Sequence, residues 1–350
     1  MKFNYLFLVI IIFSSSFLFS QKKFQVKGFG HLGYDVEYHE DDEEVDLDYV
    51  LGEQSLFISG SLAKKFSYLG EFSLNYDHHT NAVRASIRRA RVKYNYFGNH
   101  SVIIGQMHTP INYWNDVYFH ARIFYPTADR PLSFSYFIPI HSLGIRSQGQ
   151  NIGKLNFGYD IQSSSGHGID GTNPSFTSAM HIKPVEGMRI GASYYYSHLK
   201  DVNALHHQHS EQQNAASNYE GTLDYQLLSF SFARFEKSLE ILNEFSTAIT
   251  TTDSLGTAYN YSNYLYIGYN IKEKHTPFVL LDLLQSAEND LFIGPFNQLK
   301  FGIGYKHEFS PALNLKCQLE RYTAIQNMSN SSNQAPNGYE FSIQLSYAIY

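Results

Sequence analysis

The densest run of basic side chains lies at residues 86–96, which read SIRRARVKYNY. Runs of this kind mark nucleic-acid patches, targeting signals or the solvated face of a helix. None of these interpretations explains the order of the residues, because from position 89 to position 96 Arg, Arg, Lys and Asn alternate with Ala, Val, Tyr and Tyr. A period of two is typical of a β-strand with one polar and one apolar face. The two faces of this strand must therefore meet different surroundings.

The same alternation recurs along the whole chain. It is found at 26–38, 68–77, 154–162, 189–197, 260–271, 298–309, 313–321 and 339–350. The chain has 28 Tyr and 27 Phe, only 17% charged residues, and yet a polar mean hydropathy of −0.30. Alternating faces average out in any hydropathy window, so this combination predicts a transmembrane β-barrel.

Residues 1–20 have the pattern of a secretory signal peptide. One lysine precedes an apolar stretch from Tyr5 to Phe13, serines follow, and cleavage is expected after Ser20. The alternative is a membrane-anchoring helix, but the apolar stretch is shorter than the ~20 residues that a spanning helix needs. The single cysteine, Cys317, excludes an internal disulfide in this exported chain.

Short and long connections alternate between the expected strands, which is the arrangement of periplasmic turns and external loops in outer-membrane barrels. The expected long connections are 39–48, 163–174, 199–218, 287–297 and 326–338. At about 20 residues per strand and connection, residues 21–350 hold about 16 strands, with one boundary near Glu236–Ser238. We predict an all-β fold, a closed antiparallel transmembrane barrel formed by residues 21–350.

The apolar face of each strand is expected to meet lipid, so the polar face must line the interior, since a closed sheet has only two faces. Arg89, Arg91 and Lys93 are then expected in an aqueous lumen. The alternative is that they only form cross-strand pairs with Glu71 and Asp77 of the preceding strand, and the two interpretations are compatible.

Other charged residues are assigned by the same alternation. Arg88 is out of register and is expected near the external interface, where a long side chain can snorkel. The interior is expected to carry both signs, on Lys27, Arg146, Arg189, Lys300, Lys306, Lys316, Asp35, Glu37, Glu53, Asp160, Asp224, Glu308 and Glu320.

Residues 86–116, SIRRARVKYNYFGNHSVIIGQMHTPINYWND, resemble bacterial outer-membrane porins, in particular the porin-like superfamily that includes the phosphate-selective porins. They show that family's strand, short turn, strand and Gly-Gln-x-x-Thr-Pro sequence before a long loop. By architecture the resemblance covers the whole mature chain. Two features differ from that family. The apolar residues of the last strand, from Phe341 to Ile349, are displaced by one position from the usual pattern counted back from the terminal Tyr350. The lysine ladder of phosphate-selective members is missing.

The resemblance implies that the connection at 108–141, after the fifth strand, folds into the barrel and narrows it. Its many aromatic residues and prolines make it too apolar for a disordered loop. We expect its charged members, Asp116, Arg122, Asp129 and Arg130, at the constriction. The alternative is a folded external lid that never enters the pore.

Few residues indicate catalytic or metal chemistry. The sequence HHQH at 206–209 could bind Zn or Cu through imidazoles, but it lies in a polar connection without a defined element, as do His78 and His79. No metal site and no cofactor are therefore predicted. No serine-hydrolase, zinc-protease or phosphate-loop motif occurs, and a net charge of −6 argues against nucleic-acid binding.

These observations predict an outer-membrane porin, not an enzyme, through which small hydrophilic solutes or ions diffuse, with mild anion preference at the constriction. The alternative is a non-conducting barrel that acts as a binding or structural surface, or a barrel hydrolase. The resemblance implies outer-membrane lipid as the surroundings and recognition of the last strand, which ends at Tyr350, by the barrel-assembly machinery. It also implies a homotrimer, and a monomer is the alternative.

Overall fold

The computed structural model describes residues 24–77, 82–118, 125–165, 174–200, 221–236, 238–290, 293, 296–325 and 335–350. The expected signal peptide, His78, His79, Arg122 and the histidines at 206–209 lie outside the described residues.

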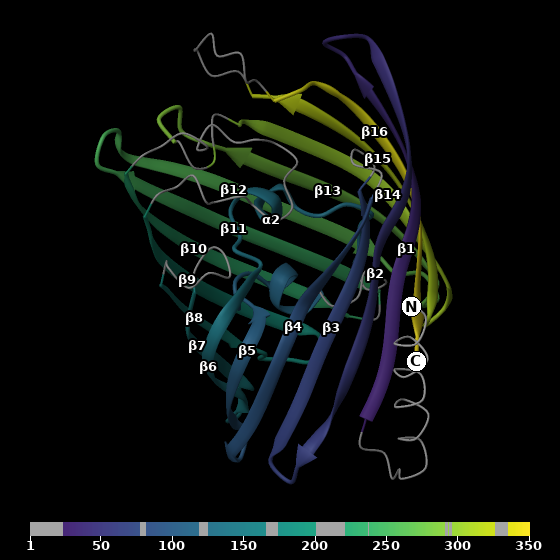
Figure 1. Ribbon diagram of the computed structural model, residues 1–350. Helices are drawn as coiled ribbons and strands as arrows, with labels where there is room; N and C mark the ends of the chain where they lie inside the picture. The colour runs from purple at the N-terminus through teal and green to yellow at the C-terminus, as the bar shows by residue number, and fades with distance from the viewer. Residues whose placement is uncertain are drawn as a thin grey trace, which may run out of the picture.

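Sixteen antiparallel strands form one closed barrel in chain order, because β1 pairs with both β2 and β16 (Figure 1). The strands are β1 (Phe24–His39), β2 (Glu44–Ala63), β3 (Phe66–Asp77), β4 (Ala82–Phe97), β5 (His100–His108), β6 (His141–Ile152), β7 (Phe157–Ser164), β8 (Ser175–Ile182), β9 (Met188–Lys200), β10 (Thr222–Phe235), β11 (Leu239–Thr252), β12 (Gly256–Tyr269), β13 (His275–Gln285), β14 (Gln298–Ser310), β15 (Leu313–Ala324) and β16 (Gly338–Ile349). The predicted fold class and the division of the stretch near 236–238 are confirmed. Within the described residues, no helix is long and apolar enough to cross a membrane.

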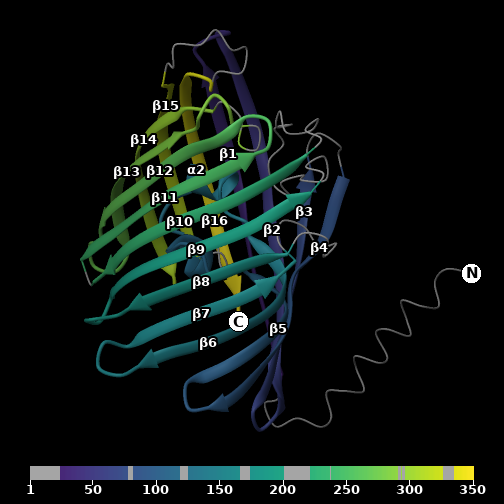
Figure 2. The ribbon, with the colours of Figure 1, turned by 90° about the vertical axis from the view of Figure 1, so that its left-hand side faces the viewer.

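The two ends of the barrel differ in their connections. The first strand begins and the last strand ends at the same end of the barrel, where Gly28 pairs with Ile349. The β2–β3, β4–β5, β6–β7 and β8–β9 turns also lie at this end (Figure 2). We call this end the terminus side and the opposite end the loop side. The prediction of a long connection at residues 39–48 is wrong. His39 ends β1 and residues 44–48 belong to β2, and a turn at 40–43 joins the two strands. The acidic residues there alternate with Val45, Leu47 and Tyr49, which gives this stretch the two faces of a strand.

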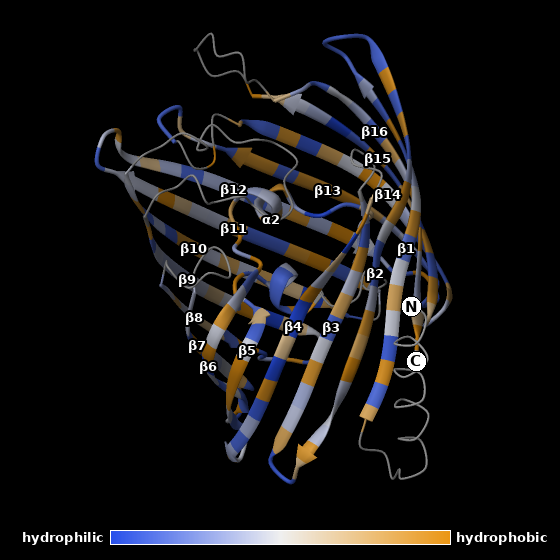
Figure 3. Cartoon of the chain, viewed as in Figure 1, coloured by the Kyte–Doolittle hydropathy of each residue, from blue (hydrophilic) through white to orange (hydrophobic). Residues whose placement is uncertain are grey.

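The strands alternate between a polar interior and an apolar exterior, visible as alternating bands along each ribbon (Figure 3). On β15, for example, Lys316 and Gln318 are buried, whereas Leu319 is 44% exposed on the outer face. The expectation for Asp224 is wrong, because Leu223 and Tyr225 fill the interior at this level of β10 and turn Asp224 outward.

Strand β4 contains a β-bulge that moves Arg88 into the interior. Arg89 pairs with Glu71, but the next pair is Ile87 with Phe72, so Arg88 is an extra residue that the register of β3 skips. A bulge shifts the alternation by one position, and it directs two successive side chains to the same face. The predicted external position of Arg88 is therefore wrong: its side chain is 5% exposed within the barrel.

The seam that closes the barrel is built around a glycine of β1. A Cβ atom on Gly30 would lie 2.0 Å from Oε1 of Gln54, because the Gln54 side chain and the Tyr347 ring meet over this glycine. The Tyr347 hydroxyl donates to the Gln54 amide oxygen, so one hydrogen bond joins β16 to β2 across β1. This contact covers a polar amide on the outer face and fixes the register of the last strand against the first.

The connection from β5 to β6 folds inside the barrel, as the sequence predicted. Two short helical turns in its described part, η2 (Trp114–Tyr118) and α2 (Leu132–Tyr136), lie within the ring of strands in Figure 1. Trp114, Phe134 and Phe137 pack against inward-facing residues of β9 to β13, including Tyr225 and Tyr264, in one buried apolar cluster. The loop therefore forms a hydrophobic core with one wall of the barrel, and the alternative of an external lid is excluded.

Candidate constriction inside the barrel

The inward loop leaves and rejoins the wall at a single point. His108, at the end of β5, pairs in register with His141, at the start of β6, and the Thr109 amide donates to the Ile140 carbonyl over 3.0 Å. The guanidinium of Arg146 donates to the His108 carbonyl, so a charged side chain of β6 holds the first residue of the loop.

The first half of the loop is fixed to β9 and β11. The Trp114 backbone amide donates to a carboxylate oxygen of Glu244 over 2.9 Å, and the Asp116 carboxylate accepts from Arg189 over 2.6 Å. Burial raises the pKa of Asp116, but the charge and hydrogen bond of Arg189 outweigh burial, and the pKa lies below its ordinary value. Asp116 is therefore held as a carboxylate by a cation of the wall.

The second half of the loop is fixed to β10, β13 and β15. The Leu132 amide donates to Asp282 over 2.6 Å, the Ala128 amide donates to Gln318 over 3.0 Å, and the Tyr225 hydroxyl donates to the Phe137 carbonyl over 2.6 Å. Backbone groups that would otherwise be buried without partners are thus satisfied by side chains of the wall. The loop is held along its length and not only at its ends.

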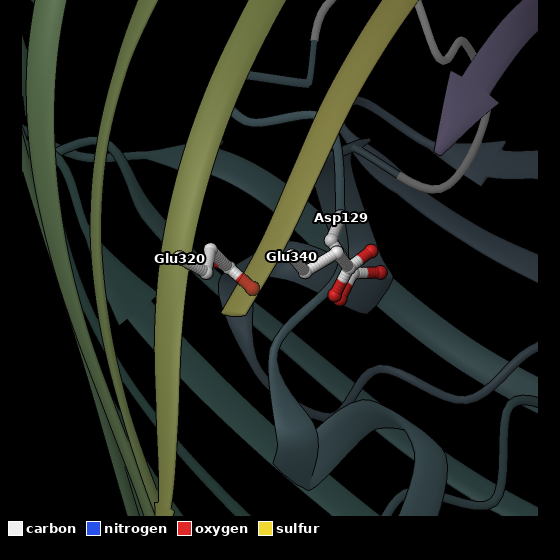
Figure 4. Close-up of side chains that lie close together, drawn as sticks. All are labelled: Asp129, Glu320 and Glu340. Carbon is white, nitrogen blue, oxygen red and sulfur yellow. The ribbon is translucent and has the colours of Figure 1, made fainter. Parts of the chain in front are cut away.

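Asp129 joins a charged cluster on the wall, shown in Figure 4. Its carboxylate lies with those of Glu320 and Glu340 so that one oxygen of each is within 4.8 Å of the others. The Lys300 ammonium lies 3.3 Å from Asp129, 3.3 Å from Glu320 and 3.8 Å from Glu340. An ammonium thus already bridges the three carboxylates, and we assign the cluster to anchoring the loop on β14 to β16.

A chain of alternating charges joins the loop to the opposite wall. The Arg130 guanidinium lies 3.7 Å from Glu53 of β2, and Glu53 lies 3.5 Å from Arg88 of β4. Arg88 also donates to the Ser73 hydroxyl over 3.0 Å. The loop therefore reaches across the lumen, and the bulge in β4 supplies one of its partners.

The basic residues of β4 divide into paired and unpaired members. Arg89 is 3% exposed, donates to Glu71 over 2.5 Å and covers the Phe57 ring, so the cross-strand alternative holds for this residue. Arg91 and Lys93 also face the interior, are only partly buried, and make no hydrogen bond or ion pair among the described residues. Two cations on one wall are therefore available to the water of the lumen.

Comparison with solved structures identifies the fold. The anion-selective porin from Comamonas acidovorans superposes with a TM-score of 0.65 at 10% identity, over 94% of this chain and 99% of that chain. The outer membrane channel DcaP of Acinetobacter baumannii gives 0.62 at 10% identity over 93% and 97%. The trimer form of OmpT, an outer membrane protein of Vibrio cholerae, gives 0.63 at 8% identity over 93% and 99%. The chain has a porin-like fold. No protein-family model and no curated protein sequence matches it.

The structure places the predicted site residues of this porin-like barrel in three groups. Arg91 and Lys93 stand free on β4, Arg89 and Glu71 form a buried pair, and the loop residues are bound to different walls, with Arg122 outside the described residues. Asp116 lies at the cationic wall, beside Arg189, and not opposite to it.

Charge is segregated around the lumen of the porin-like barrel. The strands from β4 to β9 contribute Arg91, Lys93, Arg146 and Arg189, with Asp116 and Asp160 as their nearby acids. The wall from β14 through β1 to β2 carries more carboxylates than cations: its acids include Asp35, Glu37, Glu53, Glu308, Glu320 and Glu340, and its cations include Lys300, Lys306 and Lys316. A passing ion therefore meets a field directed across the lumen.

Sequence reasoning missed the residues that hold the loop. Asp282, for example, accepts a hydrogen bond from the Leu132 amide. The signal for Asp282 was a single carboxylate among leucines in VLLDLLQ, residues 279–285. Arg88 had a signal too. The apolar residue before the two adjacent arginines is at an odd position, Ile87, whereas the apolar residues after them are at even positions, and such a change of phase marks a bulge. The alternation along residues 339–350 places Glu340 on the polar face, whereas Glu244 had no comparable signal.

Replacing Glu71 by Ala tests the buried pair. The substitution leaves the Arg89 guanidinium buried without its carboxylate, which is expected to lower the free energy of unfolding by about 3–5 kcal/mol. The measurement is urea-induced unfolding in detergent micelles, followed by tryptophan fluorescence. The double variant Glu71→Leu, Arg89→Met removes both charges and is expected to recover most of the loss; equal loss in both variants would contradict the pairing.

Proposed function

We propose that this chain is an outer-membrane channel through which small hydrophilic solutes and ions diffuse, with a preference for anions at the constriction. The observation that carries the proposal is the loop at 108–141, which narrows a closed barrel while Arg91 and Lys93 stay partly exposed and unpaired beside it. A barrel of 16 strands is wide enough to leave an aqueous channel when one side of its interior is filled.

Two of the similar structures support this proposal by their descriptions, an anion-selective porin and an outer membrane channel. Phosphate selectivity is not part of the proposal, because Lys93 is the only lysine beside Arg91 on β4 and no ladder of lysines continues from it along the described strand. The preference we propose is for negative charge in general.

The proposal includes an exported chain whose residues 1–20 are removed and whose residues 21–350 form the barrel in the outer membrane. Large apolar side chains such as Leu281 and Ile303, which are 39% and 50% exposed on the outer face, would contact lipid. A homotrimer is part of the proposal as well, supported by the trimer form of one similar structure.

Replacing Tyr350 by Asp tests the proposed recognition of the last strand by the barrel-assembly machinery. Tyr350 follows β16, is 67% exposed, and has the Lys27 ammonium 5.3 Å from its ring centre. We expect the Asp variant to reach the outer membrane in reduced amount, measured by heat-modifiable migration on gels of membrane fractions. Tyr350→Phe, which keeps an aromatic ring at the last position, is the control and should insert normally; normal insertion of the Asp variant would contradict the prediction.

Liposome swelling tests the proposed activity. Vesicles containing the purified barrel should swell in solutions of small sugars and amino acids, at rates that fall as solute size rises. Folded protein that gives no swelling above empty vesicles would favour the non-conducting alternative.

A further inference from the structure

A pocket of about 700 Å³ lies at the terminus side, between the inward loop and the turns that precede β7 and β9. The apolar part of its lining comes from Tyr113 and Val117 of the loop, from Val185 and Met188, and from Phe235 at the end of β10. The rings of Tyr113 and Phe235 stack with an interplanar angle of 14°. Val117 and Val185 are 39% and 56% exposed, so apolar surface is open to a solute here.

Cations lie at the edge of the same pocket. The Lys183 ammonium lies 3.3 Å from the Asn151 amide oxygen, which is its one side-chain partner among the described residues. The Arg189 guanidinium lies 5.3 Å from the centre of the Tyr113 ring, but it is already paired with Asp116. Glu186 also lines the pocket, at an exposed position of the turn. Lys183 is thus the cation that is free to take an anionic group.

We propose that this pocket binds organic carboxylates that carry an apolar ring, as they pass the terminus-side mouth of the channel. The inference rests on the proposed function, because it names a class of solute for that channel. An inorganic anion would gain only from Lys183 and a neutral ring only from the apolar lining, whereas an aromatic carboxylate contacts both. The volume lies within the 300–1,000 Å³ that is typical of small-molecule sites.

Current block in a planar bilayer tests the inference, with benzoate as the probe. Acetate, which has the charge without the ring, and benzamide, which has the ring without the charge, are the matched probes. We expect benzoate to reduce the current at about tenfold lower concentration than either, the difference that one charge-assisted contact supplies. The block should be stronger when benzoate is added at the terminus side than at the loop side.

The variant Lys183→Gln should weaken block by benzoate about tenfold and leave block by benzamide unchanged. Lys154→Gln is the matched control, because Lys154 is an exposed lysine of the β6–β7 turn outside the pocket lining, and its block should equal that of the unsubstituted protein. Equal block by the three probes, or equal weakening by both substitutions, would overturn the inference while leaving the channel function intact. Absence of any current from folded protein would instead overturn the proposed function.

Discussion

Deleting residues 113–134 is expected to raise the single-channel conductance by a factor of roughly two or more, because a 16-stranded barrel without an inserted loop leaves a wide aqueous channel. The deletion removes η2 and the start of α2, together with the contacts of Trp114, Asp129 and Leu132 with the wall. The ladder that closes the barrel does not pass through the loop, so the strands should still pair.

A graded control for the deletion is Trp114→Ala, which keeps the length of the loop. It removes one buried ring that packs at 5.1 Å from Tyr125 and 5.5 Å from Tyr264, measured between ring centres. The loss of a buried aromatic side chain should cost about 3–5 kcal/mol of stability, with a smaller rise in conductance than the deletion gives. A deletion variant that is folded by heat-modifiable migration but conducts no better than the full chain would show that the loop does not limit the current.

Replacing Arg91 and Lys93 together by Ser is expected to shift the channel toward cations. These side chains are the partly exposed, unpaired cations of β4, and their removal leaves the carboxylates of the opposite wall as the dominant charge. The reversal potential under a KCl gradient should move toward cation preference. Screening extends over ~10 Å at 0.1 M salt and roughly 3 Å at 1 M, so the shift should be smaller at high salt.

Two further variants control this experiment. Lys64→Ser removes an exposed lysine of the β2–β3 turn, outside the lumen, and should leave the reversal potential unchanged. Val92→Arg places a charge between Arg91 and Lys93 but on the outer face, where Val92 is 38% exposed. It should cost about 2–4 kcal/mol if it lies at the bilayer midplane, and it should reduce insertion. An unchanged potential in the Ser pair, with Val92→Arg tolerated, would mean that the two faces are reversed.

The alternation of side chains was sufficient to predict most of the barrel. Where the period of two continues without interruption, as from Arg89 to Tyr96 or along β16, the facing of every residue follows from the sequence. The prediction fails where the phase changes, as at the bulge residue Arg88. It also fails where the interior is apolar. On β10, Leu223 and Tyr225 face the interior, so the polar residue between them, Asp224, faces outward.

The position of the loop was predictable, but its partners were not. The apolar composition of residues 108–141 indicates that the loop must be buried, and the closed barrel provides the space. Which wall it contacts depends on groups distant in the sequence, such as Lys300 with Asp129 and Glu244 with Trp114. Such pairs depend on the curvature and register of the whole barrel, which no local pattern encodes.

A planar-bilayer recording under a KCl gradient measures directly whether the purified protein conducts ions past a cationic wall. We expect discrete conductance steps and a zero-current potential of the sign that indicates anion preference, which becomes weaker as the salt concentration rises on both sides. Folded protein that inserts without conductance steps would contradict the proposed channel, and a zero-current potential of the cation-selective sign would contradict the proposed anion preference.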